Sequence, residues 1–236
     1  MPQPVRGFPE RFPVRGADDP PLRYRVVTSL CRVGLRALFG NQLRIEGGDA
    51  LPAKGPVVVV CNHLSNFDPL IFGGFATHSL FCMAKRELFK PPPVAWVLAG
   101  CNCFPVDRGA ADRKALRTSL DVLALGGRLL IFVEGTRAAA PGMKRAETGV
   151  GFLIRRAAAP VLPVAVWGTE RALPRGRLLP RRVPIHMRYG RLIPVDELVA
   201  DGRRDDRLIA DAVSQRIAEL LPLEYRGVYG REEVSA

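Results

Sequence analysis

The residues best suited to chemistry follow a short apolar run. His63 and Asp68 are separated by five positions and come directly after Val57–Val60. A carboxylate that accepts a hydrogen bond from one imidazole nitrogen fixes the tautomer and leaves the other nitrogen as a general base. On one straight helix the two side chains would lie about 140° apart, so we expect a turn through Ser65-Asn66 to bring them together. The alternative is a capped loop whose histidine contacts the backbone.

Two further polar clusters also follow strand-like runs. Asp107-Arg108 comes after Cys103–Val106, and Glu134-Gly135-Thr136-Arg137 comes at the end of Leu129–Val133. A guanidinium can hold a phosphate or carboxylate through two hydrogen bonds, and glycine lets a ligand approach the backbone. Either cluster alone is also compatible with a surface turn that contains a local ion pair. Because all three polar clusters stand at the ends of expected strands, together they favour one shared site.

The elements that must position these residues alternate between short β-branched runs and helical stretches. Such alternation predicts a single α/β domain with a largely parallel central sheet flanked by helices, plus an N-terminal amphipathic helical extension. In such sheets ligands bind at the carboxyl ends of the strands. The expected strands are Val57–Val60, Leu80–Met83, Cys103–Val106, Leu129–Val133, Val161–Val166 and Ile185–Tyr189. The expected helices are Arg113–Leu125, Val150–Ala158 and Asp206–Leu221, with another starting at Asp68-Pro69.

The N-terminal part of the chain differs in composition from the rest. Residues 1–21 are rich in proline and predict a flexible arm, residues 22–40 predict an amphipathic membrane-associating helix, and residues 41–236 form the expected catalytic domain. The helix carries Arg23, Arg25, Arg32 and Arg36 beside its apolar positions, and its alternative use is to pack on the domain. The uncharged runs 69–84 and 91–106 have 16 residues each, fewer than the roughly 20 needed to span a bilayer.

The chain has 236 residues and a formal charge of +12, which favours nucleic acid, an anionic membrane surface or phosphorylated ligands as partners. A general preference for arginine is the other explanation of this charge. Five cysteines and the lack of a secretory signal predict a reducing, cytoplasmic setting. Cys101 and Cys103 have no matching pair or histidine cluster nearby, so we expect buried thiols and no metal site.

Four blocks of the sequence resemble, in order and spacing, those of the glycerolipid acyltransferases. The blocks are Asn62-His63 with Asp68, Gly100–Arg108, Phe132–Arg137 and Val161–Val164. The similarity extends from about Pro56 to Gly168 and is strongest to the bacterial 1-acyl-sn-glycerol-3-phosphate acyltransferases. Each block by itself is common, whereas their combination is specific.

The resemblance implies a reaction and a set of residues. It implies transfer of a fatty acyl group from acyl-CoA or acyl-ACP (acyl carrier protein) to 1-acyl-sn-glycerol-3-phosphate, with His63 as the general base and Asp68 orienting it. It implies no metal and no tightly bound cofactor. The residues expected around the acceptor phosphate are Lys85, Arg108, Glu134, Gly135, Thr136 and Arg137. Val133 and Ala138 depart from the proline and serine usual in the third block, which bears on the choice of acceptor.

The expected location is peripheral, on the cytoplasmic face of the cell membrane. Arg171–Arg191 contains seven arginines and no acidic residue, and with the N-terminal helix it favours an anionic leaflet. The alternative is a solvated basic loop. Phe72, Phe75, Phe81 and Trp96 are candidates to line a groove for the acyl chain, although core packing explains each of them as well.

Several rival functions remain open at the level of sequence. One is an acyltransferase for another acceptor, either glycerol-3-phosphate or a lysolipid without phosphate. Another is a basic nucleic-acid-binding module, although the sequence contains no helix-turn-helix, zinc finger or aromatic-basic RNA motif, so we expect no nucleic acid partner. The third is a catalytically silent lipid-binding relative, which intact His63 and Asp68 disfavour.

Overall fold

A seven-stranded sheet organises the computed structural model, which describes residues 19–107, 112–138, 142–177, 179–199 and 205–230. The strand order is β1-β7-β6-β2-β5-β3-β4. All neighbours run parallel except β6 and β7. The strands are β1 (Leu43–Glu46), β2 (Val57–Cys61), β3 (Phe81–Lys85), β4 (Cys103–Val106), β5 (Arg128–Phe132), β6 (Val161–Trp167) and β7 (Ile185–Tyr189).

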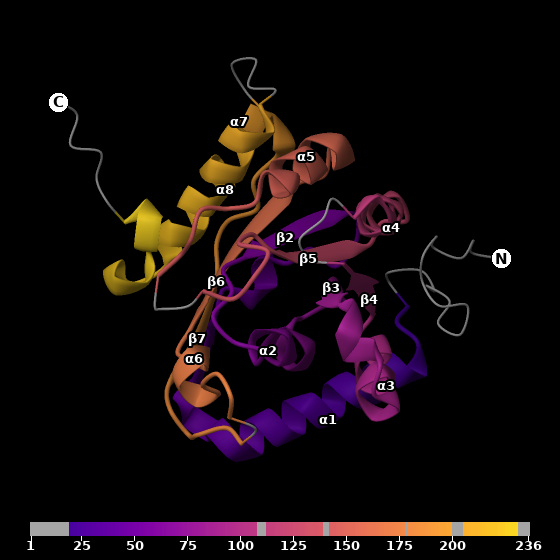
Figure 1. Cartoon of the computed structure of the whole chain (residues 1–236), viewed down its shortest axis with the longest axis vertical. Helices are drawn as coiled ribbons and strands as arrows, with labels where there is room; N and C mark the ends of the chain where they lie inside the picture. The colour runs from indigo at the N-terminus through magenta and orange to yellow at the C-terminus, as the bar shows by residue number, and fades with distance from the viewer. Residues whose placement is uncertain (1–18, 108–111, 139–141, 178, 200–204, 231–236) are drawn as a thin grey trace.

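Helices cover both faces of this sheet (Figure 1). One face is covered by α1 (Leu22–Phe39), α2 (Asp68–Phe75) and α3 (Pro92–Gly100), and the other by α4 (Arg113–Ala124), α5 (Thr148–Ala157) and α8 (Asp206–Leu220). Two short helices, α6 (Thr169–Ala172) and α7 (Val195–Val199), follow β6 and β7. Short 3-10 turns occur at Gly40–Gln42, Gly48–Ala50, Arg86–Phe89, Leu223–Tyr225 and Gly227–Tyr229.

The valine run of β2 lies in the middle of the protein because both of its faces are covered. Val57 and Val59 pack into the core beneath α1 and α2, while Val58 and Val60 pack into the core beneath α5 and α8. All four side chains are almost completely buried. Side chains alternate between the faces of a strand, so a continuous apolar run suits a strand with helices on each side. The central position of β2 places its carboxyl end at the centre of the sheet edge.

The expected elements agree with the structure, apart from small shifts and some omissions. The helix predicted over residues 22–40 ends one residue earlier, at Phe39, and β4 and β7 coincide with their predicted ranges. Strand β1 was not predicted, because four half-buried residues at the sheet edge give only a weak alternation. Helix α3 was also missed, since its sequence is uncharged all round and has no amphipathic period. The division of the chain at residues 21 and 40 stays a prediction, and residues 1–18 lie outside the described residues.

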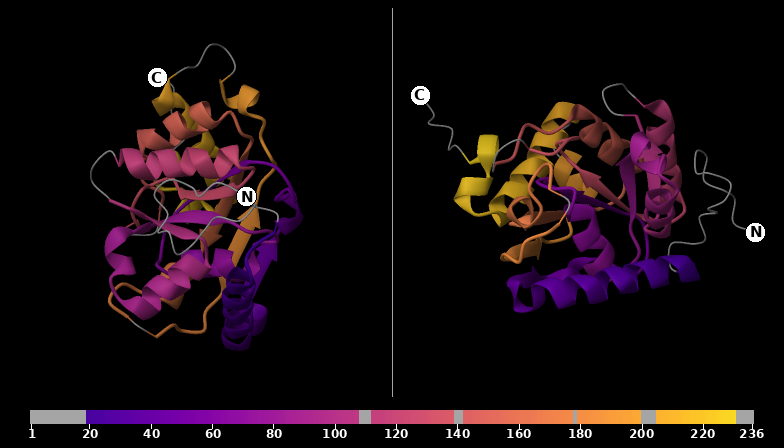
Figure 2. Two further views of the ribbon diagram at one scale, coloured as in Figure 1. Left: turned by 90° about the vertical axis from the view of Figure 1, so that its right-hand side faces the viewer. Right: turned by 60° about the horizontal axis from the view of Figure 1, so that its bottom comes forward.

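Helix α1 has two different apolar sides. Figure 2 shows it as a straight rod along one side of the molecule. Val27, Leu35 and Phe39 are buried against the domain, whereas Leu30 and Val33 remain 65% and 67% exposed. The helix therefore packs on the domain and also presents apolar side chains outward. Among the described residues, we find no helix with the combined length and hydropathy that crossing a bilayer requires.

Candidate active site

The carboxyl end of β2 carries a histidine and an aspartate in direct contact. The chain turns through Asn66 and Phe67, where the amide of Asp68 donates to the carbonyl of Ser65 (3.1 Å). This turn brings Nδ1 of His63 to 2.7 Å from Oδ2 of Asp68. The proximity expected from the sequence is therefore present. Helix α2 begins at Asp68, but its carboxylate points back into the loop and does not cap the helix.

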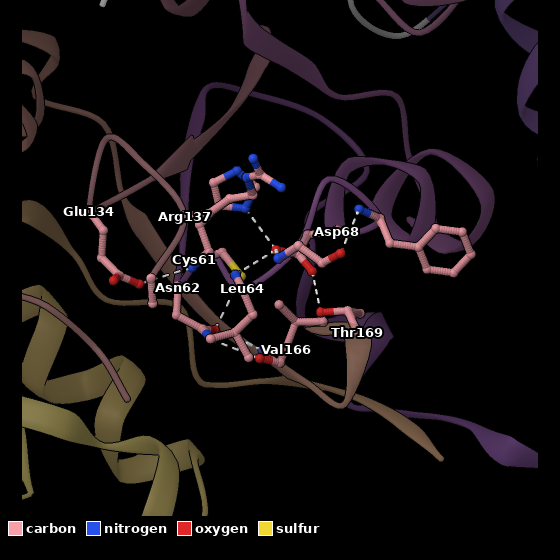
Figure 3. A network of polar contacts seen from close by, with 12 residues as sticks. Cys61, Asn62, Leu64, Asp68, Glu134, Arg137, Val166 and Thr169 are labelled. Atoms are coloured by element: carbon pink, nitrogen blue, oxygen red, sulfur yellow. Dashed lines mark hydrogen bonds and ion pairs between the residues drawn. The ribbon is translucent and has the colours of Figure 1, made fainter. Parts of the chain in front are cut away.

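The Asp68 carboxylate is completely buried and is surrounded by donors (Figure 3). Its Oδ2 accepts the amides of Leu64 (2.8 Å) and Ser65 (2.9 Å) in addition to Nδ1 of His63. Its Oδ1 accepts the hydroxyl of Thr169. Backbone amides can only donate, so this carboxyl group acts as an acceptor and Nδ1 of His63 carries the hydrogen. The unprotonated nitrogen of the ring is then Nε2, as a general base requires.

The imidazole is also held by an aromatic ring. Phe132, the last residue of β5, stacks on His63 with ring centroids 4.1 Å apart and an interplanar angle of 21°. Only 4% of the His63 side chain is exposed. Aspartate on one side and phenylalanine on the other therefore fix both the orientation and the plane of the ring.

Two buried side chains tie the histidine loop to β6 and to the segment after it. The amide group of Asn62 donates to the carbonyl of Val166 (2.8 Å) and accepts its N–H (2.9 Å). The hydroxyl of Ser65 donates to the carbonyl of Leu173 (3.0 Å). These bonds connect the histidine loop to residues that follow the fourth block in the sequence. Ser65 has a structural role here, because its hydroxyl is buried and already makes a hydrogen bond.

Glu134 supports the histidine loop from the side of β5. Its carboxylate accepts the amide of His63 on Oε1 and the amide of Lys144 on Oε2, both at 3.0 Å. The side chain is 2% exposed, and burial raises the pKa of this carboxyl group. Glu134 therefore shapes the site by joining two loops, and its oxygens face backbone amides.

The loop after β5 depends on its individual residues. Gly135 has a φ of +63°, and a Cβ at this position would lie 2.9 Å from Cγ of Glu147, so glycine is required. The amide of Val133 donates to the carbonyl of Cys61 (2.9 Å) and continues the β2–β5 ladder. Proline, usual at this position, cannot make that bond. Thr136 is exposed and its amide donates to the carbonyl of Glu134 (2.7 Å).

Arg137 is held near His63 by a backbone hydrogen bond of the next residue, Ala138. The amide of Ala138 donates to the carbonyl of His63 (2.9 Å), which brings the Arg137 segment against the histidine loop. The carbonyls of Arg137 and Ala138 accept one terminal nitrogen of Arg175, at 3.0 and 3.1 Å. The Arg137 side chain is half-buried. The loops after β2, β5 and β6 thus meet at one place.

Lys85, another expected site residue, lies further along the same sheet edge. Lys85 ends β3, is exposed, and has its Nζ 3.3 Å from a carboxylate oxygen of Glu87. Arg108 lies outside the described residues. Its neighbour Asp107 pairs with Nε of Arg86 at 2.5 Å. β3 and β4 are the second and third strands from β2 in the sheet order. The structure therefore places Lys85 at the same edge as His63 but at the end of another strand.

The cysteines do not form a metal site in the described part of the chain, where no group of three or more histidine, cysteine, aspartate or glutamate side chains has a suitable arrangement. Cys103 is buried, and its sulfur lies 2.9 Å from that of Cys82 on the adjacent strand.

Phe72 and Phe81, expected as candidates for an acyl groove, are core residues with exposures of 1% and 3%. Trp96 is 51% exposed on α3.

Two contributors to the site were not identified from the sequence. Thr169 follows β6 and is 101 residues from Asp68, so no local spacing connects them. Phe132 was treated only as part of a strand and a block. The available signal in each case was position, because both residues stand at the carboxyl end of a strand adjacent to β2.

Comparison with known proteins identifies relatives of this chain. A sequence profile of the Acyltransferase family matches residues 42–167. The chain is 32% identical over 150 residues to a 1-acyl-sn-glycerol-3-phosphate acyltransferase of Pseudomonas aeruginosa, over 61% of this chain and 58% of that protein. It is 27% identical over 184 residues to the Bacillus subtilis protein of the same name, over 75% of this chain and 87% of the relative.

The fold is shared with a solved relative. The crystal structure of the 1-acyl-sn-glycerophosphate acyltransferase of Thermotoga maritima superposes with a TM-score of 0.68, over 84% of this chain and 79% of that one. Because the sequence identity is 23%, this similarity is evidence for the fold alone. The α/β class predicted from the alternating pattern is confirmed. The first curated relative is longer than the region matched, since the chain spans 58% of its length.

Proposed function

Because the chain belongs to the Acyltransferase family, as the four sequence blocks predicted, we propose that it transfers a fatty acyl group from a thioester to 1-acyl-sn-glycerol-3-phosphate. The product is then phosphatidic acid. The observation that carries the proposal is the buried contact between Nδ1 of His63 and Oδ2 of Asp68 at 2.7 Å. This pair stands in the segment that corresponds to the relatives' first block.

The pair supports general-base catalysis. An alcohol is a poor nucleophile at neutral pH, so Nε2 of His63 takes the hydroxyl proton of the acceptor as its oxygen attacks the thioester carbonyl. The C–S bond then breaks, and the imidazolium returns the proton to the departing sulfur, which leaves as a thiol. Asp68 carries a negative charge beside the ring and stabilises the imidazolium between these steps.

Direct transfer, without an acyl-enzyme intermediate, agrees with the surroundings of the base. The Ser65 hydroxyl donates to the carbonyl of Leu173 and is 1% exposed. Cys61 is fully buried, and burial raises the pKa of its thiol well above its usual value. A nucleophile must be accessible and activated, and neither residue meets both conditions.

The acceptor phosphate is assigned to the cations at the same sheet edge. Arg137 stands in the loop that contacts His63, Lys85 is the last residue of β3, and Arg108 comes two positions after β4 in the sequence. A guanidinium pairs with a phosphate through charge-assisted hydrogen bonds. Gly135 and Glu134 maintain the loop that carries Arg137, and Thr136 offers an exposed hydroxyl there. No metal or bound cofactor enters this mechanism, which uses only the protein and its two substrates.

An acyl-transfer assay tests the proposal directly. The purified chain is given acyl-CoA or acyl-ACP with one of three acceptors: 1-acyl-sn-glycerol-3-phosphate, glycerol-3-phosphate or a lysolipid that lacks phosphate. We expect phosphatidic acid from the first acceptor and little product from the other two. Equal use of the lysolipid without phosphate would contradict the phosphate assignment, and no product from any acceptor would contradict acyl transfer.

We also propose peripheral attachment to the cytoplasmic face of an anionic membrane. Leu22, Leu30 and Val33 on α1 are 65–75% exposed, and the Arg171–Arg191 segment adds seven cations. Each cation near an anionic leaflet contributes about 1 kcal/mol, and exposed apolar side chains can insert at the interface. Sedimentation with vesicles tests this proposal. We expect the protein to bind anionic vesicles and to be partly released by high salt. Failure to bind either anionic or neutral vesicles would contradict the proposal.

A further inference from the structure

A polar cavity of about 380 Å³ lies between α1 and the amino ends of the central strands. One side of it is formed by α1. The opposite side comes from the end of α2 with the loop that leads to β3, and from Arg128 at the start of β5. His63 stands beyond the other end of β2, and five residues of strand span roughly 16 Å. This cavity is therefore separate from the candidate active site.

The lining of the cavity is basic and rich in hydroxyl groups. It includes Arg25 and Arg32 from α1, Arg128, His78, Ser29 and Ser79. The described residues that line it include no aspartate or glutamate. Arg25 pairs with Asp19 at its rim (2.7 Å), where both side chains are well exposed. Several donors and cations around one cavity suit an anion with many acceptor oxygens.

Main-chain contacts fix two of these guanidinium groups. Nε of Arg32 donates to the carbonyl of Gly74 (2.6 Å), and Nε of Arg128 donates to the carbonyl of Pro52 (2.7 Å). For Arg32, this contact uses one of the five N–H donors of its guanidinium. Positions 25 and 32 are seven residues apart, so both arginines lie on nearly the same side of α1. The arrangement therefore exists before any ligand binds.

The outward side of α1 supplies a second feature beside the cavity. Leu22, Val26, Leu30 and Val33 are exposed and fall within an arc of about 80° on the helix. Arg25 and Arg32 flank this apolar stripe on one side. A ligand that has an anionic group and a hydrocarbon chain matches both features at once, with its anion at the arginines and its chain along the stripe.

We propose that this cavity binds the phosphate group of an anionic glycerophospholipid, at a site additional to the one that binds the acceptor. The inference rests on the membrane-facing role of α1 in the proposed function, and it is independent of acyl transfer. Occupation of the cavity by a lipid phosphate anchors α1 in a defined orientation at the headgroup level of the leaflet. The apolar stripe then points into the leaflet.

Three single substitutions on α1 provide a matched test. Arg25→Gln and Arg32→Gln each remove a cation from the cavity. Arg36→Gln removes the same charge one turn further along; Arg36 lies over the ring of Phe75 (5.7 Å) and does not line the cavity. All three side chains are exposed, and equal thermal melting temperatures confirm that the variants fold. Arg137→Ala serves as the control for binding at the acceptor site.

Binding is measured with a soluble short-chain phosphatidylglycerol, with vesicles that contain phosphatidylglycerol, and with inorganic phosphate. We expect Arg25→Gln and Arg32→Gln each to weaken binding of the short-chain lipid about 10-fold, while Arg36→Gln and Arg137→Ala stay within twofold of the unchanged chain. Competition by inorganic phosphate at millimolar concentration would show that free phosphate also occupies the site. Lipid binding that phosphate does not compete with would show that the acyl chains of the lipid contribute to binding.

Equal losses from all three arginine substitutions would overturn the proposal, since they indicate a diffuse charge effect. Loss of binding in Arg137→Ala alone would also overturn it, because the lipid then binds at the acceptor site. Short-chain lipid binding that depends on Arg25 and Arg32, without any vesicle binding, would support the cavity and contradict membrane attachment. These experiments measure lipid binding and not acyl transfer, so a failure of the proposed acyl transfer would be detected separately, in the acyl-transfer assay.

Discussion

The hydroxyl of Thr169 donates a hydrogen bond to Oδ1 of Asp68, the carboxylate whose other oxygen holds Nδ1 of His63. This contact joins the segment after β6 to the loop after β2. Among the described contacts, the donors of the His63 loop reach only Oδ2 of Asp68, and the Thr169 hydroxyl is the donor to Oδ1. The position of the imidazole therefore depends on a residue 101 positions away in the sequence.

Replacement of Thr169 tests whether this hydroxyl positions the aspartate. Thr169→Val keeps the shape but removes the donor, and we expect kcat to fall about 10-fold with little change in the KM of either substrate, the cost of one hydrogen bond to a charged group. Thr169→Ser retains the hydroxyl and should restore most of the activity. An equal loss in both variants would indicate a packing role instead.

Replacement of the base should have the largest effect. His63→Ala is expected to lower transfer by about 10²-fold or more, the usual contribution of a general base. Asp68→Asn should be milder but still severe, because the imidazolium loses the adjacent charge. His186→Ala, which alters a histidine stacked on Trp167 and outside the site, is the matched control. Near-normal turnover in folded His63→Ala protein would overturn the mechanism.

Arg137→Ala tests the assignment of the acceptor phosphate. Loss of a charge-assisted contact costs about 1.5–3 kcal/mol, so we expect the KM for 1-acyl-sn-glycerol-3-phosphate to rise roughly 10- to 100-fold. The KM for the thioester should stay unchanged, and Arg177→Ala, an exposed arginine of the basic segment, should affect neither. A rise confined to the thioester KM would show that Arg137 serves the donor.

Glu134 should leave a signature in the pH dependence of stability. Burial raises the pKa of its carboxyl group in the folded protein above the ordinary value of 4.5. Its contribution to the free energy of unfolding is therefore fully present below the unfolded pKa and is lost as the pH rises through the folded pKa. In Glu134→Gln this titration is absent. We expect the stability of the unchanged chain relative to Glu134→Gln, measured by urea unfolding, to decrease from pH 4 to pH 7; a constant or increasing difference would contradict the assignment.

Cys31 is expected to be the most reactive thiol. A hydrogen bond from Cys101 lowers the pKa of Cys31, and Cys31 is only half-buried, whereas Cys61, Cys82 and Cys103 are buried. Iodoacetamide reacts with the thiolate, so Cys31 should be labelled first at pH 7, below the usual cysteine pKa of about 8.5. Cys101→Ala should slow labelling of Cys31 at pH 7 but hardly at pH 9. Equal rates for both proteins at pH 7 would rule out this hydrogen bond.

The sequence by itself determined most of the elements and their order, although it did not reveal β1 or α3. The valine run of β2 predicted a strand covered on both faces, and both faces are covered. The apolar and basic pattern of residues 22–40 predicted α1, which has the same start and ends at Phe39. The spacing of His63 and Asp68 predicted a contact through a turn, and the contact is present. These features depend on hydrophobic periodicity and short-range geometry, which neighbouring residues in the chain specify.

Only the tertiary structure decided which groups complete the site and which side of α1 faces the domain. The Thr169 hydroxyl on Asp68 and the contact of Glu134 with the His63 amide join loops that are far apart in the chain, and spacing within one segment carries no information about them. In the same way, the burial of Leu35 and Phe39 and the exposure of Leu30 depend on where α2 and α3 lie. Side-chain partners are selected by packing, because a buried polar group must find its donors or acceptors wherever the fold brings them.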